Sequence, residues 1–308
     1  MSIPRWSRAA SLWWLAAAYG HGAAASEIVK LTHQGVERTA VLHRPAKASA
    51  GARPLVVVLH GQGGTGADLR RWAGFDALAD REGFVAVYPD AIDGRWSYGR
   101  PIILPMPSVK GETVDDVGFL RRLIAHLVER DIADVARVYV FGVSRGGLMA
   151  FTLACVLDDV IAAAAPVVTG MTDHQRDDCK PQRPVPIVVI AGTHDRAQWY
   201  DGWIYQSGRL LSVPESLEFW RARHGCTGQQ TRLLPHRRAD DPTGVALIEW
   251  TGCAIEVPLR LYRIEGGGHQ LPSTAGGATP LSDPKFGRRN ADIETAEEVW
   301  AFFKRHTR

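Results

Sequence analysis

The stretch GVSRGG, residues 142–147, decides the fold of this chain. It follows the apolar run RVYVF at residues 137–141, which is typical of a buried strand, and precedes LMAFTLA at residues 148–154, which is typical of a buried helix. Glycines two residues before and two residues after Ser144 would let the strand and the helix approach without a Cβ clash. The turn would hold Ser144 in a strained conformation at the helix N-terminus, where free N–H groups favour a developing oxyanion. The pattern predicts an activated serine rather than a glycine-rich turn with an incidental one.

Apolar strands alternate with helices on both sides of this stretch. The expected strands are residues 27–31, 38–42, 55–59, 84–89, 161–168, 185–191, 245–250 and 259–264, and the expected helices are residues 67–79, 117–130, 215–224 and 292–304. Thr113 and Asp116 form a plausible capping box for the second helix. The alternation predicts the α/β class, with one mostly parallel central sheet and helices on both faces.

The first 25 residues differ from the rest of the chain. Arg5 and Arg8 give a basic start, residues 11–18 are apolar, and three alanines at residues 23–25 offer an A-x-A cleavage site. This pattern predicts a secretory signal peptide at residues 1–25, with an uncleaved N-terminal anchor as the alternative. No internal repeat or linker divides the remainder, so residues 26–308 are expected to form a single catalytic domain.

The composition indicates a globular protein and gives no sign of a strongly charged partner. Of 308 residues, 45% are hydrophobic and 22% charged, which is enough apolar material for a large core. The formal net charge is +3, and removal of residues 1–25 takes away two arginines and no acidic residue. A nearly balanced charge gives no reason to expect nucleic acid or, after signal cleavage, a membrane as a partner. The expected partner is a small-molecule or oligomeric substrate, and the oligomeric state stays open.

Four cysteines, an even number in a chain expected to be exported, favour two disulfides. None of them has the C-x-x-C spacing of zinc or redox sites. Three connectivities are possible, and sequence neighbours favour Cys155 with Cys179 and Cys226 with Cys253. The alternative is four reduced, buried thiols, which requires that the signal peptide be misread.

The serine needs a base, and the base needs a carboxylate that fixes its tautomer. In parallel sheets of this kind, sites lie beyond the carboxyl ends of the strands, with the order serine, acid, histidine along the chain. Asp195 follows the strand at 185–191, and His269 follows the strand at 259–264 on a glycine-rich loop. We therefore expect Ser144, Asp195 and His269 to be the catalytic residues.

Other residues could fill these positions. Asp201 and Asp173 are the rivals for the acid, and His224 and His236 are less well placed for the base because neither directly follows a convincing strand. A solvated loop histidine is the alternative interpretation of His269.

The oxyanion hole should combine the backbone N–H of Arg145 with that of Gln62, in the loop HGQGG at residues 60–64. His60 is expected to be a structural hydrogen-bonding residue rather than a second base. His194 has no second ligand at metal spacing, so we expect no metal and no cofactor.

Taken in order, five motifs resemble those of a known family. The motifs are HGQGG (60–64), DDVGF (115–119), GVSRGG (142–147), GTHD (192–195) and GGGH (266–269), and they are similar to those of secreted polyhydroxybutyrate depolymerase-like and feruloyl esterase-like enzymes. Cys226, Cys253 and the final WAFF at residues 300–303 fit the same pattern, so the resemblance covers nearly the whole mature chain. It implies an exported serine carboxylesterase of α/β-hydrolase fold, with the triad and disulfide pairs given above.

The sequence departs from the family pattern around the expected pocket. Residues 270–272 are QLP where such enzymes usually have Thr-Trp-Pro, and residues 198–200 are QWY where Val-Pro-Tyr is common. Arg145 stands where a small or polar residue is usual. The substrate therefore stays open among feruloyl or acetyl esters of polysaccharide and hydroxybutyrate oligomers.

Aromatic and basic side chains suggest which chemical groups the substrate contains. Residues expected to supply an aromatic platform for a sugar or phenolic group are Trp96, Tyr98, Trp199, Tyr200 and Trp203, although about half of such aromatics belong to cores. Arg145 and Arg196 could favour an anionic acyl group. Two other functions fit the same fold: a serine peptidase, and a non-catalytic binding protein that retains the triad residues.

Overall fold

The computed structural model describes residues 25–45, 51–98, 108–109, 112–205, 208–254, 257–275 and 279–308. The signal peptide expected at residues 1–25 lies outside this part of the chain, except for Ala25, which begins the first strand. The division into a signal peptide and one catalytic domain stays a prediction.

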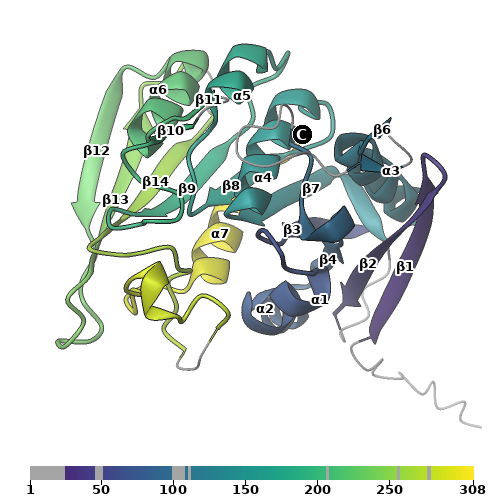
Figure 1. The fold of residues 1–308 in the computed structure, drawn as a ribbon, viewed down its shortest axis with the longest axis horizontal. Helices are drawn as coiled ribbons and strands as arrows, with labels where there is room; N and C mark the ends of the chain where they lie inside the picture. The colour runs from purple at the N-terminus through teal and green to yellow at the C-terminus, as the bar shows by residue number, and fades with distance from the viewer. Residues whose placement is uncertain are drawn as a thin grey trace, which may run out of the picture.

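A ten-stranded sheet forms the centre of the molecule (Figure 1). Its strands, in spatial order, are β1 (Ala25–His33), β2 (Val36–Arg44), β4 (Val85–Pro89), β3 (Arg53–Leu59), β7 (Ala133–Val143), β8 (Ala163–Val167), β9 (Ile187–Gly192), β14 (Leu259–Glu265), β13 (Gly244–Thr251) and β12 (Gly228–Leu233). The strands from β4 to β14 run parallel, and antiparallel strands extend the sheet at both edges. The mostly parallel central sheet predicted from the sequence is confirmed.

Helices cover both faces of the sheet. One face carries α3 (Asp116–Glu129), α4 (Arg145–Val156) and α6 (Val213–His224), and the other carries α1 (Gly66–Trp72), α2 (Phe75–Glu82) and α7 (Thr295–Phe303). A short helix, α5 (Asp173–Asp178), and two small ribbons, β5 (Ser108–Val109) with β6 (Glu112–Thr113) and β10 (Trp203–Tyr205) with β11 (Gly208–Leu210), complete the described part. In that part of the chain, no helix is long and apolar enough to cross a membrane.

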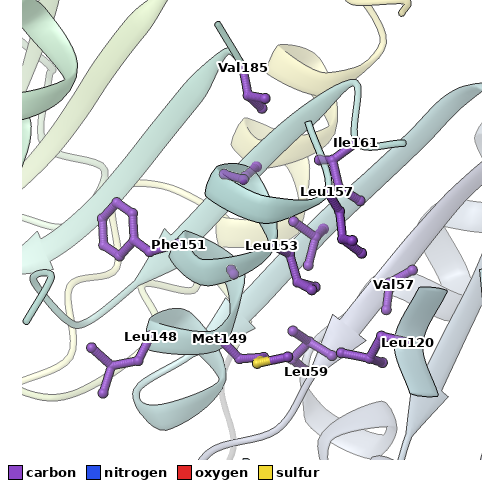
Figure 2. Packing of buried hydrophobic residues seen from close by; sticks show 14 of the residues in the cluster. Val57, Leu59, Leu120, Leu148, Met149, Phe151, Leu153, Leu157, Ile161 and Val185 are labelled. Carbon is purple, nitrogen blue, oxygen red and sulfur yellow. The ribbon is translucent and has the colours of Figure 1, made fainter. Parts of the chain in front are cut away.

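The central strands are buried on both faces, as their unbroken apolar runs predict. In β3, Val57 and Leu59 pack with α3 and α4, whereas Val56 and Val58 pack with α1, α2 and α7. Figure 2 shows the first of these two cores, where side chains of α4 lie against the sheet. The first core holds α4 against the sheet behind the turn at Ser144.

Three details differ from the sequence prediction. The helix expected at residues 67–79 is two helices, because Gly74 has a φ of 80° and interrupts the helical path. Asp115, rather than Thr113, caps α3 by accepting a hydrogen bond from the Gly118 amide. Asp116 is fully buried and bonds the Arg38 guanidinium at 2.6 Å, a tertiary contact that a capping pattern cannot reveal.

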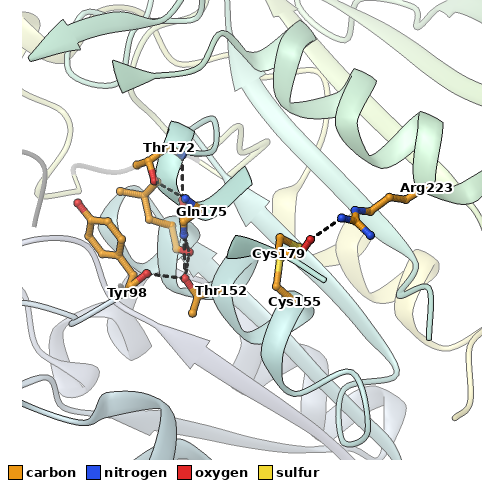
Figure 3. Close-up of a disulfide and its surroundings, with 8 residues drawn as sticks. Tyr98, Thr152, Cys155, Thr172, Gln175, Cys179 and Arg223 are labelled. Atoms are coloured by element: carbon orange, nitrogen blue, oxygen red, sulfur yellow. Dashed lines mark hydrogen bonds between the residues drawn. A yellow bond between two sulfur atoms is a disulfide. The ribbon is translucent and has the colours of Figure 1, made fainter. Parts of the chain in front are cut away.

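Two disulfides tie helices to neighbouring loops, with the pairing favoured by the sequence. Cys155 of α4 bonds Cys179 directly after α5, as Figure 3 shows, and Cys226 after α6 bonds Cys253. The bonds join residues 24 and 27 positions apart, and loops of this size stabilise a fold by about 3 kcal/mol each. The alternative of four reduced thiols is wrong for this structure.

Burial of His224 predicts a loss of stability in acid. The side chain ends α6 in the core, and burial lowers the pKa of its imidazole to about 4. An unfolded histidine has a pKa of about 6.5, so the unfolded state binds the proton first as the pH falls. The stability from neutral His224 is therefore complete above about pH 6.5 and is lost as the pH falls towards 4.

Urea unfolding at pH 7 and pH 5 measures this effect. Replacing His224 with Gln should shrink the difference in unfolding free energy between the two pH values by about 2 kcal/mol. His126→Gln, on the half-exposed side of α3, is the matched control and should leave the difference unchanged. An unchanged pH dependence in His224→Gln would contradict the assignment.

Candidate active site

Ser144 occupies a turn between β7 and α4 that only close backbone packing permits. Its φ of 57° and ψ of −116° lie in a region that residues with a Cβ rarely adopt. A Cβ on Gly142 would overlap the carbonyl oxygen of Gly146, and a Cβ on Gly146 would overlap that of Leu59 at the end of β3. The glycines of the GVSRGG stretch are therefore required by the packing of strand against helix.

Backbone hydrogen bonds link the segments that follow β7 and β9 to the neighbouring strands at this edge of the sheet. The Ser144 amide donates to the Val167 carbonyl of β8 at 2.9 Å, and the Thr193 amide donates to the Ile264 carbonyl of β14 at 3.0 Å. The strand β8 lies between β7 and β9, so β7 and β9 are about 10 Å apart. The loops that follow β7, β9 and β14 thus emerge at one edge of the sheet.

Asp195 and His269 meet at this edge. His269 Nδ1 lies 2.7 Å from Asp195 Oδ2, and both side chains are buried. The other carboxylate oxygen accepts the amides of Ala197 and Gln198, each at 2.8 Å. With Nδ1–H donated to the carboxylate, Nε2 keeps its lone pair and can accept a proton.

The rival acids are placed differently. The Asp173 carboxylate accepts the amides of His174 and Arg209 beside α5, and Asp201 is exposed. His224 lies buried at the end of α6, and His236 pairs with Asp292 at 3.1 Å. The carboxylate that contacts the glycine-loop histidine is Asp195.

Residues 284–288 hold the histidine loop, which sequence reasoning missed. The His269 amide donates to the Phe286 carbonyl at 2.6 Å, and the Gly268 amide donates to Arg288 at 2.8 Å. Gln270 Nε2 donates to the carbonyl of Gly287. A Cβ on Gly268 would overlap the Phe286 carbonyl. The run of glycines before His269 was therefore the one sign in the sequence that another backbone segment packs closely there.

The loop at residues 60–64 lies against the turn at Ser144. A Cβ on Gly61 would stand 3.6 Å from Ser144 Cβ, and Gln62 follows on the exposed side of the loop. In α4, the Leu148 amide donates to Ser144 at 3.0 Å, so the amide of Arg145 precedes the first bond within the helix. The loop that carries Gln62 and the first turn of α4 thus meet at Ser144, and the oxyanion role of the Gln62 and Arg145 amides stays a prediction.

His60 has the structural role expected from the sequence. Its Nδ1 lies 2.7 Å from the Gly61 carbonyl and donates to it, while Nε2 accepts the Ala91 amide at 3.1 Å. Burial lowers the pKa of His60, which favours the neutral ring that this pair of bonds requires. The imidazole therefore fixes the loop and has no free nitrogen for proton transfer.

Trp96 and Tyr98 are core residues, and their prediction as substrate contacts is wrong. Trp96 is 0% exposed and its Nε1 donates to the His60 carbonyl at 2.9 Å, while Tyr98 is 2% exposed. Between them, the Ser97 amide donates to the buried Asp116 at 2.6 Å. Trp96 therefore supports the loop at residues 60–64, and the Tyr98 carbonyl accepts from Thr152 of α4.

The Arg145 side chain is buried away from solvent. It is 3% exposed, its Nε donates to the Trp96 carbonyl at 3.0 Å, and its guanidinium carbon lies 4.9 Å from the centre of the Tyr98 ring. Because these contacts hold the guanidinium inside the protein, the hypothesis that Arg145 selects an anionic acyl group is not supported. Arg196 is exposed on the loop after Asp195.

The remaining aromatic residues lie beyond the acid. Trp199 and Trp203 are 40% and 45% exposed and stack with ring centres 5.0 Å apart, whereas Tyr200 packs partly against the core. Contact of Trp199 or Tyr200 with substrate stays a prediction. Across the described residues, no three His, Cys, Asp or Glu side chains gather as metal ligands would, and His194 is an exposed loop residue.

Comparison with known proteins assigns the family. The model of the dienelactone hydrolase family matches residues 39–201, which is more than half of the chain and includes the turn at Ser144. The chain belongs to the dienelactone hydrolase family. Its relatives agree with the α/β-hydrolase fold and with the esterase resemblance inferred from the motifs.

Two relatives and one solved structure illustrate the likeness. Feruloyl esterase B of Piromyces equi is 33% identical over 162 residues, covering 50% of this chain and 29% of its own. The bifunctional acetylxylan esterase/xylanase XynS20E of Neocallimastix patriciarum is 27% identical over 246 residues, covering 79% of this chain and 32% of its own. The chain thus spans about a third of the length of each relative. An acetyl xylan esterase structure from Aspergillus awamori is 13% identical, with a TM-score of 0.59 over 90% of this chain and 99% of its own, and shares the fold.

The backbone at Ser144 predicts an unusual order of stability. Gly adopts the φ and ψ observed there without steric cost, whereas Ala keeps the Cβ that is strained by about 1–3 kcal/mol. Ser144→Gly should therefore be more stable than Ser144→Ala by about 1 kcal/mol, measured by urea unfolding.

The exposed Ser282, whose φ lies outside the left-handed region, provides the matched control. There the Gly variant should be no more stable than the Ala variant, because Gly loses more backbone entropy on folding. The same order at both positions would contradict backbone strain at Ser144.

Proposed function

We propose that the protein is an exported serine carboxylesterase that hydrolyses esters through an acyl-enzyme. The observation that carries the proposal is the buried contact of 2.7 Å between His269 Nδ1 and Asp195 Oδ2. This pair lies at the same sheet edge as the strained turn that presents Ser144. Nucleophile, base and orienting acid then follow the chain order of α/β-hydrolases.

In the acylation step, Ser144 Oγ attacks the ester carbonyl carbon while His269 Nε2 takes the hydroxyl proton. The carbonyl π electrons move to the oxygen, and the amides of Gln62 and Arg145 donate hydrogen bonds to this oxyanion. When the tetrahedral intermediate collapses, the bond to the alcohol oxygen breaks and His269 gives its proton to the departing alcohol. Asp195 keeps the imidazole in one tautomer and stabilises its cationic form.

In deacylation, water replaces the serine as nucleophile. His269 takes a proton from water as the hydroxide oxygen bonds to the acyl carbon, and then returns the proton to Ser144 Oγ as the acyl–serine bond breaks. The products are a carboxylic acid and an alcohol, and the enzyme regains its starting protonation. Each step uses side chains and backbone amides of this chain.

Export is supported by the covalent chemistry of the chain. Two disulfides pair all four cysteines, and such bonds form and persist in oxidising compartments. The basic and apolar pattern of residues 1–25 provides the corresponding signal. The protein is thus expected in the periplasm or the medium.

The substrate class follows from the names of the relatives and from the motif resemblance. Feruloyl and acetyl esters of polysaccharide are the first candidates, because the relatives include a feruloyl esterase and an acetylxylan esterase. Esters of hydroxybutyrate oligomers are the other candidate. An ester panel with a feruloyl, an acetyl and a hydroxybutyryl member would separate them.

Ser144→Ala tests the nucleophile. Turnover of p-nitrophenyl acetate should fall by about 10⁴- to 10⁶-fold, because the residual rate would come only from binding and oxyanion stabilisation. Thr231→Ala removes an exposed hydroxyl of the edge strand β12 and should keep the wild-type rate. A Ser144→Ala protein that retains most of the activity would overturn the proposal.

A further inference from the structure

Trp199 and Trp203 form an exposed aromatic ledge beside the acid loop. Their rings stack at 29° with centres 5.0 Å apart, and each keeps two fifths or more of its surface exposed. The mechanism above uses neither side chain. Contiguous exposed apolar surfaces are typical of interaction sites, so the ledge is a candidate ligand-binding site.

The ledge is fixed to the candidate active site through the backbone. The Gln198 amide donates to Asp195 Oδ1 at 2.8 Å, and Trp199 is the next residue. Trp199 is four positions after Asp195, which limits their Cα distance to about 14 Å. Trp203 lies on β10, which pairs with β11. Figure 1 shows these two strands beside α5 and α6.

Polar groups border the ledge. A hollow of about 420 Å³ next to Trp203 is lined by Asp201 and Arg209 as well as by apolar atoms of Ile204. Arg209 Nη2 lies 3.0 Å from Glu215 Oε1, so its guanidinium is held in place while more than a third of the side chain stays exposed. A guanidinium that is held in place and the exposed carboxylate of Asp201 thus line a hollow together with the Trp203 indole.

We propose that this ledge binds a sugar ring in the alcohol portion of an oligosaccharide ester. A pyranose has an apolar face of C–H groups that stacks on an indole, and a rim of hydroxyls that bonds carboxylate and guanidinium groups. The ledge offers the same combination at the hollow, where the Trp203 indole, stacked on that of Trp199, lies beside Asp201 and Arg209. The link from this binding to catalysis rests on the esterase function proposed above.

Other occupants match the surroundings less well. A phenolic acyl group is flat and aromatic on both faces and would use few of the charged rim groups. A hydroxybutyrate oligomer is aliphatic and has no rim of hydroxyls for Asp201 and Arg209. The polar rim therefore favours a carbohydrate.

Calorimetry on a catalytically inactive protein tests binding without turnover. In the Ser144→Ala background, unesterified xylotetraose should bind, and adding Trp203→Ala should weaken binding about tenfold. Trp203→Phe should recover part of the affinity, because it keeps an aromatic face. Leu233→Ala, which removes an exposed apolar side chain of β12, is the matched control and should leave binding unchanged.

Kinetics connect the ledge to ester hydrolysis. Trp203→Ala should raise the KM for feruloylated or acetylated xylo-oligosaccharides about tenfold, and should affect p-nitrophenyl acetate, which has no sugar, much less. Leu233→Ala should leave both activities unchanged. If Trp203→Ala changed neither xylotetraose binding nor this KM, the proposal that the ledge binds a sugar would be overturned. A larger loss with methyl ferulate or with hydroxybutyrate oligomers than with oligosaccharide esters would also overturn it, in favour of that occupant.

The two proposals fail in different ways. A protein that binds xylotetraose through Trp203 but hydrolyses no ester would contradict the esterase function and keep the ledge. A protein that hydrolyses simple esters yet shows no Trp203-dependent binding would keep the esterase function and reject the ledge.

Discussion

Close backbone packing around Ser144 is the constraint on which the rest of the structure depends. Gly146 lies against the Leu59 carbonyl at the end of β3, and a Cβ on Gly147 would come within 2.7 Å of Thr169 Cγ2 beyond β8. One turn therefore fixes the helix α4, the loop that carries Gln62, and the segment after the neighbouring strand. The strain in the Ser144 backbone persists because β7 is buried in both cores and α4 is buried in the first of them.

The same principle brings Asp195 and His269 together. A Cβ on Gly192 would overlap the carbonyls of Gly267 and Gly268, so the loops after β9 and β14 touch through their backbones. The His194 amide donates to the Gly267 carbonyl at 2.8 Å, which secures this contact beside Asp195. The geometry of the Asp195–His269 pair thus depends on glycines that have no chemistry of their own.

Local signals in the sequence predicted the sheet, the strained turn and the disulfide pairs, because periodicity, glycine spacing and cysteine order are all short-range features. Tertiary burial could not be predicted in the same way. Trp96 resembles any loop tryptophan until its Nε1 is found on the His60 carbonyl, and Asp116 resembles a helix cap until Arg38 reaches it from β2. Residues 284–288 contain no recognisable motif, and only their contacts with the loop before His269 reveal their role.

The central claim is that Ser144 is a nucleophile that this scaffold activates. Peptide mass mapping after reaction with a fluorophosphonate tests it most directly, because the probe bonds covalently to an activated serine. The account predicts one adduct, on the peptide that contains Ser144, and a sharp loss of labelling in Asp195→Asn, where the base loses its orienting carboxylate. A protein that hydrolyses esters while Ser144 stays unlabelled, or that carries the adduct on another residue, would contradict the account.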